Sequence, residues 1–125
     1  MNNDLLVYFG SSIILFWGVA HIIPTKAVVD GLKESSKENN LIKTVEWVAE
    51  GFAFLFIGLL VIAVTSIIGA DKIGSSVVYT LSAIALMSLS FWSLSLGKHS
   101  SFLPIKICPL IKTFVAMLYL WVVFI

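Results

Sequence analysis

The chain has 125 residues, of which 59% are hydrophobic and 12% are charged, and its net charge is +1. A soluble domain carries about 25% charged residues, so this chain has too few charges to cover a surface that faces water. The eight basic residues are all lysines. They form no basic stripe and no nucleic-acid-binding motif, which argues against nucleic acid as a partner. The single cysteine, Cys108, excludes an intrachain disulfide framework.

Four apolar segments are each long enough to cross a bilayer, which takes about 20 mostly apolar residues in an α-helix. The predicted spans are residues 5–23, 41–69, 76–96 and 102–125. Lys106, Pro109 and Lys112 interrupt the last segment, so the sequence leaves open whether that helix spans fully or begins at Pro109. The pattern predicts an all-α fold, with residues 1–125 forming a single polytopic domain, an antiparallel four-helix transmembrane bundle.

The lysines lie unevenly about this predicted bundle. Four spans place both termini and the 70–73 connection on one side of the membrane. Seven of the eight lysines fall on the other side, namely Lys26, Lys33, Lys37, Lys43, Lys98, Lys106 and Lys112. Because lysine-rich loops stay in the cytoplasm, we expect a multi-pass cell-membrane protein with both termini outside and the 24–40 loop cytoplasmic.

Ionisable side chains gather at the predicted cytoplasmic ends of the spans. His21 lies near the end of the first span, Glu46 and Glu50 near the start of the second, and His99 just after the third, while Cys108 lies in the fourth. Glu50 is the sharpest signal, since it borders a long apolar run. An ionisable side chain at membrane depth is costly and normally pairs or lines a polar cavity. His21 is its expected partner, and whether Glu50 is charged stays open.

The spacing of polar and small residues predicts which helix faces point inward. Glu46 and Glu50 are four residues apart and therefore share one face. Small and hydroxyl residues mark helix contacts in membranes, because they let backbones approach and can bond across the contact. The expected inward faces are Ser11, Gly18 and His21 in the first span and Ser88, Trp92, Ser95 and His99 in the third.

Residues 17–58, a third of the chain, carry three short motifs: WGVAH at 17–21, EWVAEG at 46–51 and GLL at 58–60. This pattern resembles the DoxX-like group of small four-helix bacterial membrane proteins, with His21 at the place of a basic residue of that family. The resemblance implies a four-helix membrane bundle and, in some members, an association with quinone-linked redox systems.

The first functional hypothesis is a binding site for a small lipophile with a polar head, such as a quinone or a lipid. Pockets of this kind are mostly apolar with a few placed polar groups. The predicted site is floored by His21, Glu46 and Glu50 and walled by Trp17, Trp47 and Trp92. A redox-linked accessory subunit is a variant of the same hypothesis.

Three alternatives stay open. A haem or metal protein could use His21, Glu50 and His99 as ligands, although the chain has no Glu-x-x-His or His-x-x-x-His spacing. A membrane enzyme could use His21 and Glu50 as an acid–base pair. An oligomeric structural or transport element could pair its serine-rich third span with a second copy. The sequence names no cofactor, and the partners it predicts are the lipid bilayer, a lipophilic small molecule and another copy of the chain.

Overall fold

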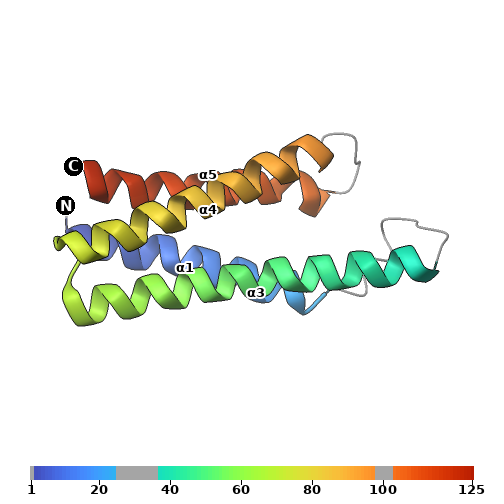
Figure 1. Ribbon diagram of the computed structural model, residues 1–125, viewed down its shortest axis with the longest axis horizontal. Coiled ribbons are helices and arrows are strands. Elements are labelled where there is room, and N and C mark those ends of the chain that lie inside the picture. The colour runs from blue at the N-terminus through green and yellow to red at the C-terminus, as the bar shows by residue number, and fades with distance from the viewer. Residues whose placement is uncertain (1, 25–36, 98–102) are drawn as a thin grey trace.

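The computed structural model describes residues 2–24, 37–97 and 103–125 of the chain. Within these residues the fold is all-helical, with α1 at Asn3–Ile22, α3 at Lys37–Ile68, α4 at Ile73–Gly97 and α5 at Leu103–Phe124. Each helix holds a stretch long and apolar enough to cross a membrane, at Asn3–Ile22, Leu41–Ile68, Ile73–Ser95 and Lys106–Phe124. The helices lie side by side, and both termini lie at the same end as the connection between α3 and α4 (Figure 1).

Each predicted span falls on one of these helices. The third helix begins at Ile73, a few residues before the predicted span. The fourth begins at Leu103 and contains Pro109 in its interior. Proline removes one backbone donor from a helix, and a membrane helix tolerates this where neighbouring groups bond the backbone nearby. The Ser90 hydroxyl donates to the carbonyl of Pro109 itself at 2.9 Å, which is not the carbonyl that the proline frees, and so ties α4 to α5 at this point.

The four described helices form a ring in which each contacts two neighbours. The contact of α1 with α3 and that of α4 with α5 are extensive, the contact of α1 with α5 is smaller, and that of α3 with α4 is the smallest. Helices α3 and α5 therefore lie diagonally opposite each other, as do α1 and α4. Residues 69–72 connect α3 to α4, and the two helices diverge with distance from this connection (Figure 1). The side between α3 and α4 is the least closed side of the bundle.

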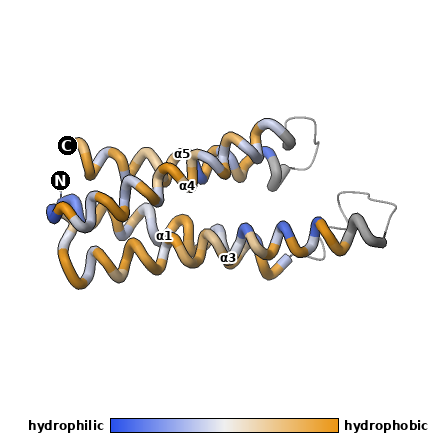
Figure 2. The backbone as a smooth tube through the Cα atoms, viewed as in Figure 1, coloured by the Kyte–Doolittle hydropathy of each residue, from blue (hydrophilic) through white to orange (hydrophobic). Residues whose placement is uncertain are grey.

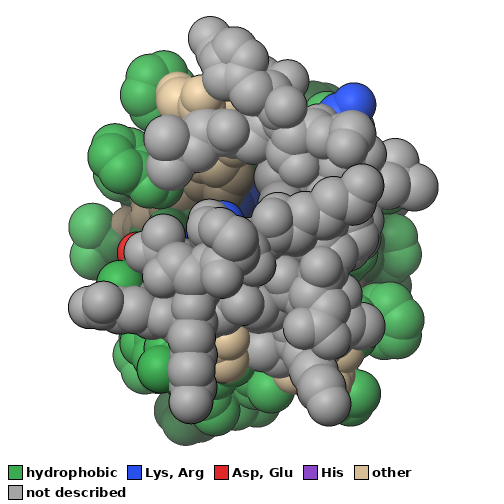
Figure 3. All heavy atoms as spheres, turned by 90° about the vertical axis from the view of Figure 1, so that its right-hand side faces the viewer, with side chains coloured by type: hydrophobic (Ala, Val, Ile, Leu, Met, Phe, Trp, Pro, Cys, Tyr) green, Lys and Arg blue, Asp and Glu red, His purple; other side chains and the backbone are tan. Residues whose placement is uncertain are grey.

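Most of the apolar surface faces outward. The apolar stretches bury only 28–39% of their residues inside the bundle. Large side chains such as Phe16, Phe56 and Phe91 are 73%, 66% and 71% exposed. Hydrophobic residues run along all four helices (Figure 2) and form the outer rim when the bundle is seen end-on (Figure 3). An exposed apolar surface of this extent matches an apolar environment rather than water.

A layer of buried hydroxyl groups holds the half of the bundle that is nearer the termini. The Ser11 hydroxyl bonds to Tyr119 at 2.9 Å, and the Thr65 hydroxyl bonds to Tyr79 at 2.6 Å. The two tyrosine rings stack with their centroids 6.2 Å apart. Because each of the four helices contributes one residue, this hydroxyl layer joins the whole ring. Polar contacts of this kind bind membrane helices together where no hydrophobic effect acts between them.

Two glycines allow α1 and α3 to approach closely. A Cβ added to Gly51 would lie 2.5 Å from a side-chain carbon of Ile22, and one added to Gly18 would lie 3.0 Å from the Gly51 carbonyl oxygen. A side chain at either position would push the helices apart. This close contact lies next to His21 and Glu50 in the sequence, so it also fixes the separation of those two side chains.

We predict that Gly51→Ala lowers the free energy of unfolding by about 1–3 kcal/mol, the usual cost of overpacking a tight contact. Gly74→Ala is the matched control. A Cβ at Gly74 would meet only one atom, of Ile68, at 4.0 Å. The control should leave stability unchanged or raise it slightly through helix propensity. Denaturation in detergent, followed by circular dichroism, measures both, and equal stability of the two variants would contradict the close contact.

Candidate functional site

Lys112 is a fully buried cation inside α5. Its ammonium group donates to Oε1 of Glu50 at 2.6 Å and to the Leu89 carbonyl at 3.1 Å. It also donates to the Ser93 hydroxyl. A lysine ammonium has three donor hydrogens, so these three bonds use all of them. The buried charge is therefore both paired and fully hydrogen-bonded, which is the condition under which a charge persists away from water.

Glu50 joins this cation to His21. Its second carboxylate oxygen, Oε2, lies 3.5 Å from Nε2 of His21. We call Lys112, Glu50 and His21 the charged triad. The triad draws on α5, α3 and α1, and α4 supplies the Leu89 carbonyl and Ser93, so every described helix takes part. The side chains of His21 and Lys112 are 1% and 0% exposed, whereas that of Glu50 is 21% exposed.

Aromatic rings hold the imidazole of His21 in place. The Trp47 ring stacks on it with centroids 3.6 Å apart and planes 11° from parallel, and Phe54 meets it edge-on at 5.4 Å. The Trp47 indole N–H also donates to the His21 carbonyl, near the end of α1. Phe54 in turn lies 5.6 Å from the Lys112 nitrogen, a cation–π distance. The triad is thus walled by rings from α3.

Trp17 and Cys108 lie beside the triad and join α1 to α5. The Trp17 indole N–H donates to the Cys108 sulfur at 3.3 Å. Cys108 is 2% exposed and lies four residues, about one helical turn, before Lys112. This contact reinforces the packing of α1 against α5 next to the charges.

The structure brings together some of the predicted site residues and separates others. His21, Glu50 and Trp47 are in contact as described, and Trp17 lies next to the triad through Cys108. Glu46, although one turn from Glu50 on the same helix, is exposed. His99 lies outside the described residues.

The predicted inward face of the third span is wrong. Trp92 is 66% exposed, and Ser88 and Ser95 are exposed as well. Trp92 therefore forms no wall of the site. The face that α4 buries is set instead by its large core side chains, Tyr79 and Leu86, and carries Ser90 and Ser93 toward α5. In α1 the prediction is confirmed, because Ser11, Gly18 and His21 are all buried.

Lys112 is the site residue that sequence reasoning missed. The sequence places it among the lysines at the cytoplasmic surface, where a basic residue near a helix end normally lies. Two features indicate otherwise. Residues 107–111 and 113–125 hold no other charged residue, and Glu50 is an acid in an apolar span that needs a cationic partner. His21 supplies only part of that pairing.

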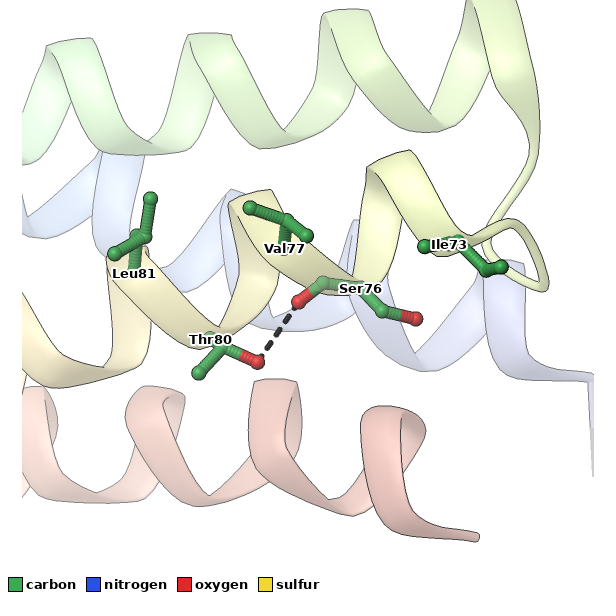
Figure 4. Close-up of a pocket in the computed structure, with 5 residues that line it drawn as sticks. All are labelled: Ile73, Ser76, Val77, Thr80 and Leu81. Carbon is green, nitrogen blue, oxygen red and sulfur yellow. Dashed lines mark hydrogen bonds between the residues drawn. The ribbon is translucent and has the colours of Figure 1, made fainter.

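We also searched the described residues for a metal site and for a pocket. No group of three or more His, Cys, Asp or Glu side chains is placed to hold a metal ion in this part of the chain. A shallow depression of about 310 Å³ lies on α4 between Ile73 and Leu81 (Figure 4). Its two hydroxyl groups already bond to backbone carbonyls, since that of Thr80 donates to Ser76 at 2.8 Å and that of Ser76 donates to Lys72 at 3.3 Å.

Comparison of the chain with family models, with curated proteins and with solved structures gives no match. The resemblance to the DoxX-like group stays a prediction.

We predict that Lys112→Met lowers the free energy of unfolding by about 3–5 kcal/mol, because it leaves the Glu50 carboxylate without its cation. Lys106→Met, six residues earlier on the same helix and exposed, should change stability by less than about 0.5 kcal/mol.

The double variant Glu50→Gln/Lys112→Met removes both charges and should recover most of the loss. Denaturation in detergent of the unmodified protein, of Glu50→Gln, of Lys112→Met and of the double variant gives the coupling energy of the pair. A double variant as unstable as Lys112→Met would show that the lost charge is not what matters.

Proposed function

We propose that the chain is a polytopic membrane protein whose helices form an antiparallel four-helix transmembrane bundle in the cell membrane. The outward apolar surface supports this, since the apolar stretches bury only 28–39% of their residues. The polar side chains inside also support it, because in lipid such groups must be satisfied within the protein. The hydroxyl layer and the charged triad meet that requirement.

We further propose that both termini lie outside the cell and that the 24–40 loop is cytoplasmic. Lys112 is buried in the bundle, so it no longer counts as a loop lysine. The remaining lysines still divide six to one, with only Lys72 near the termini (Lys26, Lys33, Lys37, Lys43, Lys98 and Lys106 on the other side). This asymmetry supports a cytoplasmic position for the end that carries the triad.

The function that this geometry supports best is the binding of a small lipophilic molecule with a polar head at the charged triad. The observation that carries the proposal is the fully buried Lys112, ion-paired with Glu50 inside apolar helices. Glu50 lies at the edge of the uncharged apolar run of α3, which begins at Gly51, and Lys112 pairs with it inside the bundle. Ionisable side chains inside a membrane bundle are expensive and mark ligand or ion sites in membrane proteins.

A structural role alone accounts poorly for this arrangement. Replacing a buried ion pair by apolar residues of similar volume is often neutral or stabilising, so stability by itself does not favour the charges. The partly exposed carboxylate of Glu50 gives a ligand a polar contact, while the apolar helix surfaces would hold its tail. A quinone or a lipid is such a molecule, and the resemblance to DoxX-like proteins would place a quinone-binding chain in a redox-linked accessory role.

We predict opposite sides of the membrane for the two connections. Cysteines placed at Ser35 and at Asp71, each in a Cys108→Ala background, are treated in intact cells with a thiol reagent that cannot cross membranes. The Asp71→Cys protein should be labelled in intact cells, and the Ser35→Cys protein only after the cells are opened. Labelling of both in intact cells would contradict the transmembrane topology.

We predict that a lipophilic compound co-purifies with the protein in mild detergent and that Glu50→Gln reduces it at least tenfold. A hydrogen bond to a charged group is worth about 1.5–3 kcal/mol, which corresponds to about 10–150-fold in affinity. Glu46→Gln is the matched control, with the same charge removed one turn away at an exposed position. Mass spectrometry of the extracted lipids measures the three proteins. Equal recovery from all three, or no compound with the unmodified chain, would contradict the proposal.

A further inference from the structure

The hydrogen bonds within the charged triad determine which kind of ligand head group the triad can bind. The three ammonium hydrogens of Lys112 are taken by Glu50, Leu89 and Ser93. Its side chain is also 0% exposed, so a ligand can neither reach the ammonium nor find a free donor on it. Lys112 therefore serves to hold the carboxylate in place and to neutralise it, rather than to contact a ligand.

Glu50 is the only member of the triad with substantial accessible surface. Its side chain is 21% exposed, whereas that of His21 is 1% exposed. Of the two carboxylate oxygens, Oε1 receives the short bond from Lys112, while Oε2 lies 3.5 Å from Nε2 of His21. An ionised carboxylate accepts hydrogen bonds and donates none. A ligand at this edge therefore meets an acceptor.

The charge balance of the triad further restricts the class of head group that the ligand can carry. The Glu50 carboxylate is already compensated by Lys112 at 2.6 Å, so the pair is neutral as a unit. A cationic head group would bring an uncompensated charge into an apolar region, which costs far more than one hydrogen bond returns. An anionic head group, or one with carbonyl oxygens alone such as an oxidised quinone, would place oxygen lone pairs against those of the carboxylate. Of the quinone class, the hydroxyl-bearing quinol form is therefore the one that fits.

Building on the proposed function, we infer that the ligand is a neutral lipophile whose head donates a hydroxyl hydrogen, an alcohol or a phenol, to the Glu50 carboxylate.

The test compares two probes that differ in one hydrogen-bond donor. The protein in phosphatidylcholine nanodiscs is equilibrated with 4-nonylphenol or with its methyl ether, and bound probe is measured by mass spectrometry above the level taken up by empty nanodiscs. We expect the phenol to bind the unmodified protein and Glu46→Gln at least tenfold more tightly than the ether does. In Glu50→Gln this difference should fall to about twofold or less, because the charged acceptor is gone.

Each other outcome has a definite meaning. If both probes bind equally well and both lose affinity in Glu50→Gln, the site stands as proposed, but the inference about the hydroxyl donor is wrong. If neither probe binds above the level of empty nanodiscs, or binding is unchanged in Glu50→Gln, both the inference and the proposed site are wrong. The neutral double variant Glu50→Gln/Lys112→Met repeats the measurement in a protein without the buried cation, so that a loss of binding is not assigned to unfolding.

Discussion

The ion pair between Glu50 and Lys112 crosses the centre of the bundle. Its two residues belong to α3 and α5, which lie diagonally opposite in the ring and have almost no backbone contact of their own. The remaining two helices complete the same cluster, α1 through His21 and α4 through Ser93 and the Leu89 carbonyl. At the other end of the bundle the chain itself joins α3 to α4 at residues 69–72. At the triad's end, the side chains of the triad, together with Ser93 and the Leu89 carbonyl, join all four helices.

The two polar layers of the bundle differ in kind. Near the termini, Ser11, Thr65, Tyr79 and Tyr119 form a neutral layer of hydroxyl groups that satisfy one another. Between the layers the core is apolar and includes the fully buried residues Ile14, Leu86 and Val115. Only the triad's layer carries charge, and it lies where α3 and α4 have drawn apart. The residues of the hydroxyl layer are buried and neutral, whereas the triad contains a partly exposed carboxylate, and this difference makes the triad the functional candidate.

The sequence predicts the helices well because the length of an apolar run is a strong constraint in lipid. It also predicts that His21 and Glu50 meet, since they lie at one depth on adjacent helices. It fails for the inward face of α4, and the reason is physical. A serine in a helix can bond to a carbonyl of its own preceding turn, as the Ser95 hydroxyl does with Phe91 at 2.9 Å. An exposed serine in an apolar helix is therefore already satisfied, and a serine stripe does not identify the interior.

The buried position of Lys112 could not be predicted from the sequence for a related reason. A lysine near the cytoplasmic end of a span normally extends its long side chain to the membrane surface, and only the packed bundle shows that this one turns inward. Because its side chain points into the bundle, the Lys112 ammonium requires an acidic partner, and Oε1 of Glu50 provides it. The second oxygen lies 3.5 Å from Nε2 of His21, on a side chain that the bundle leaves partly exposed. A partly exposed carboxylate in an apolar environment gains from a further hydrogen-bond donor, such as a hydroxyl group. The incomplete sealing of Glu50 within an otherwise closed cluster is therefore the feature that a purely structural ion pair leaves unexplained and a bound ligand accounts for.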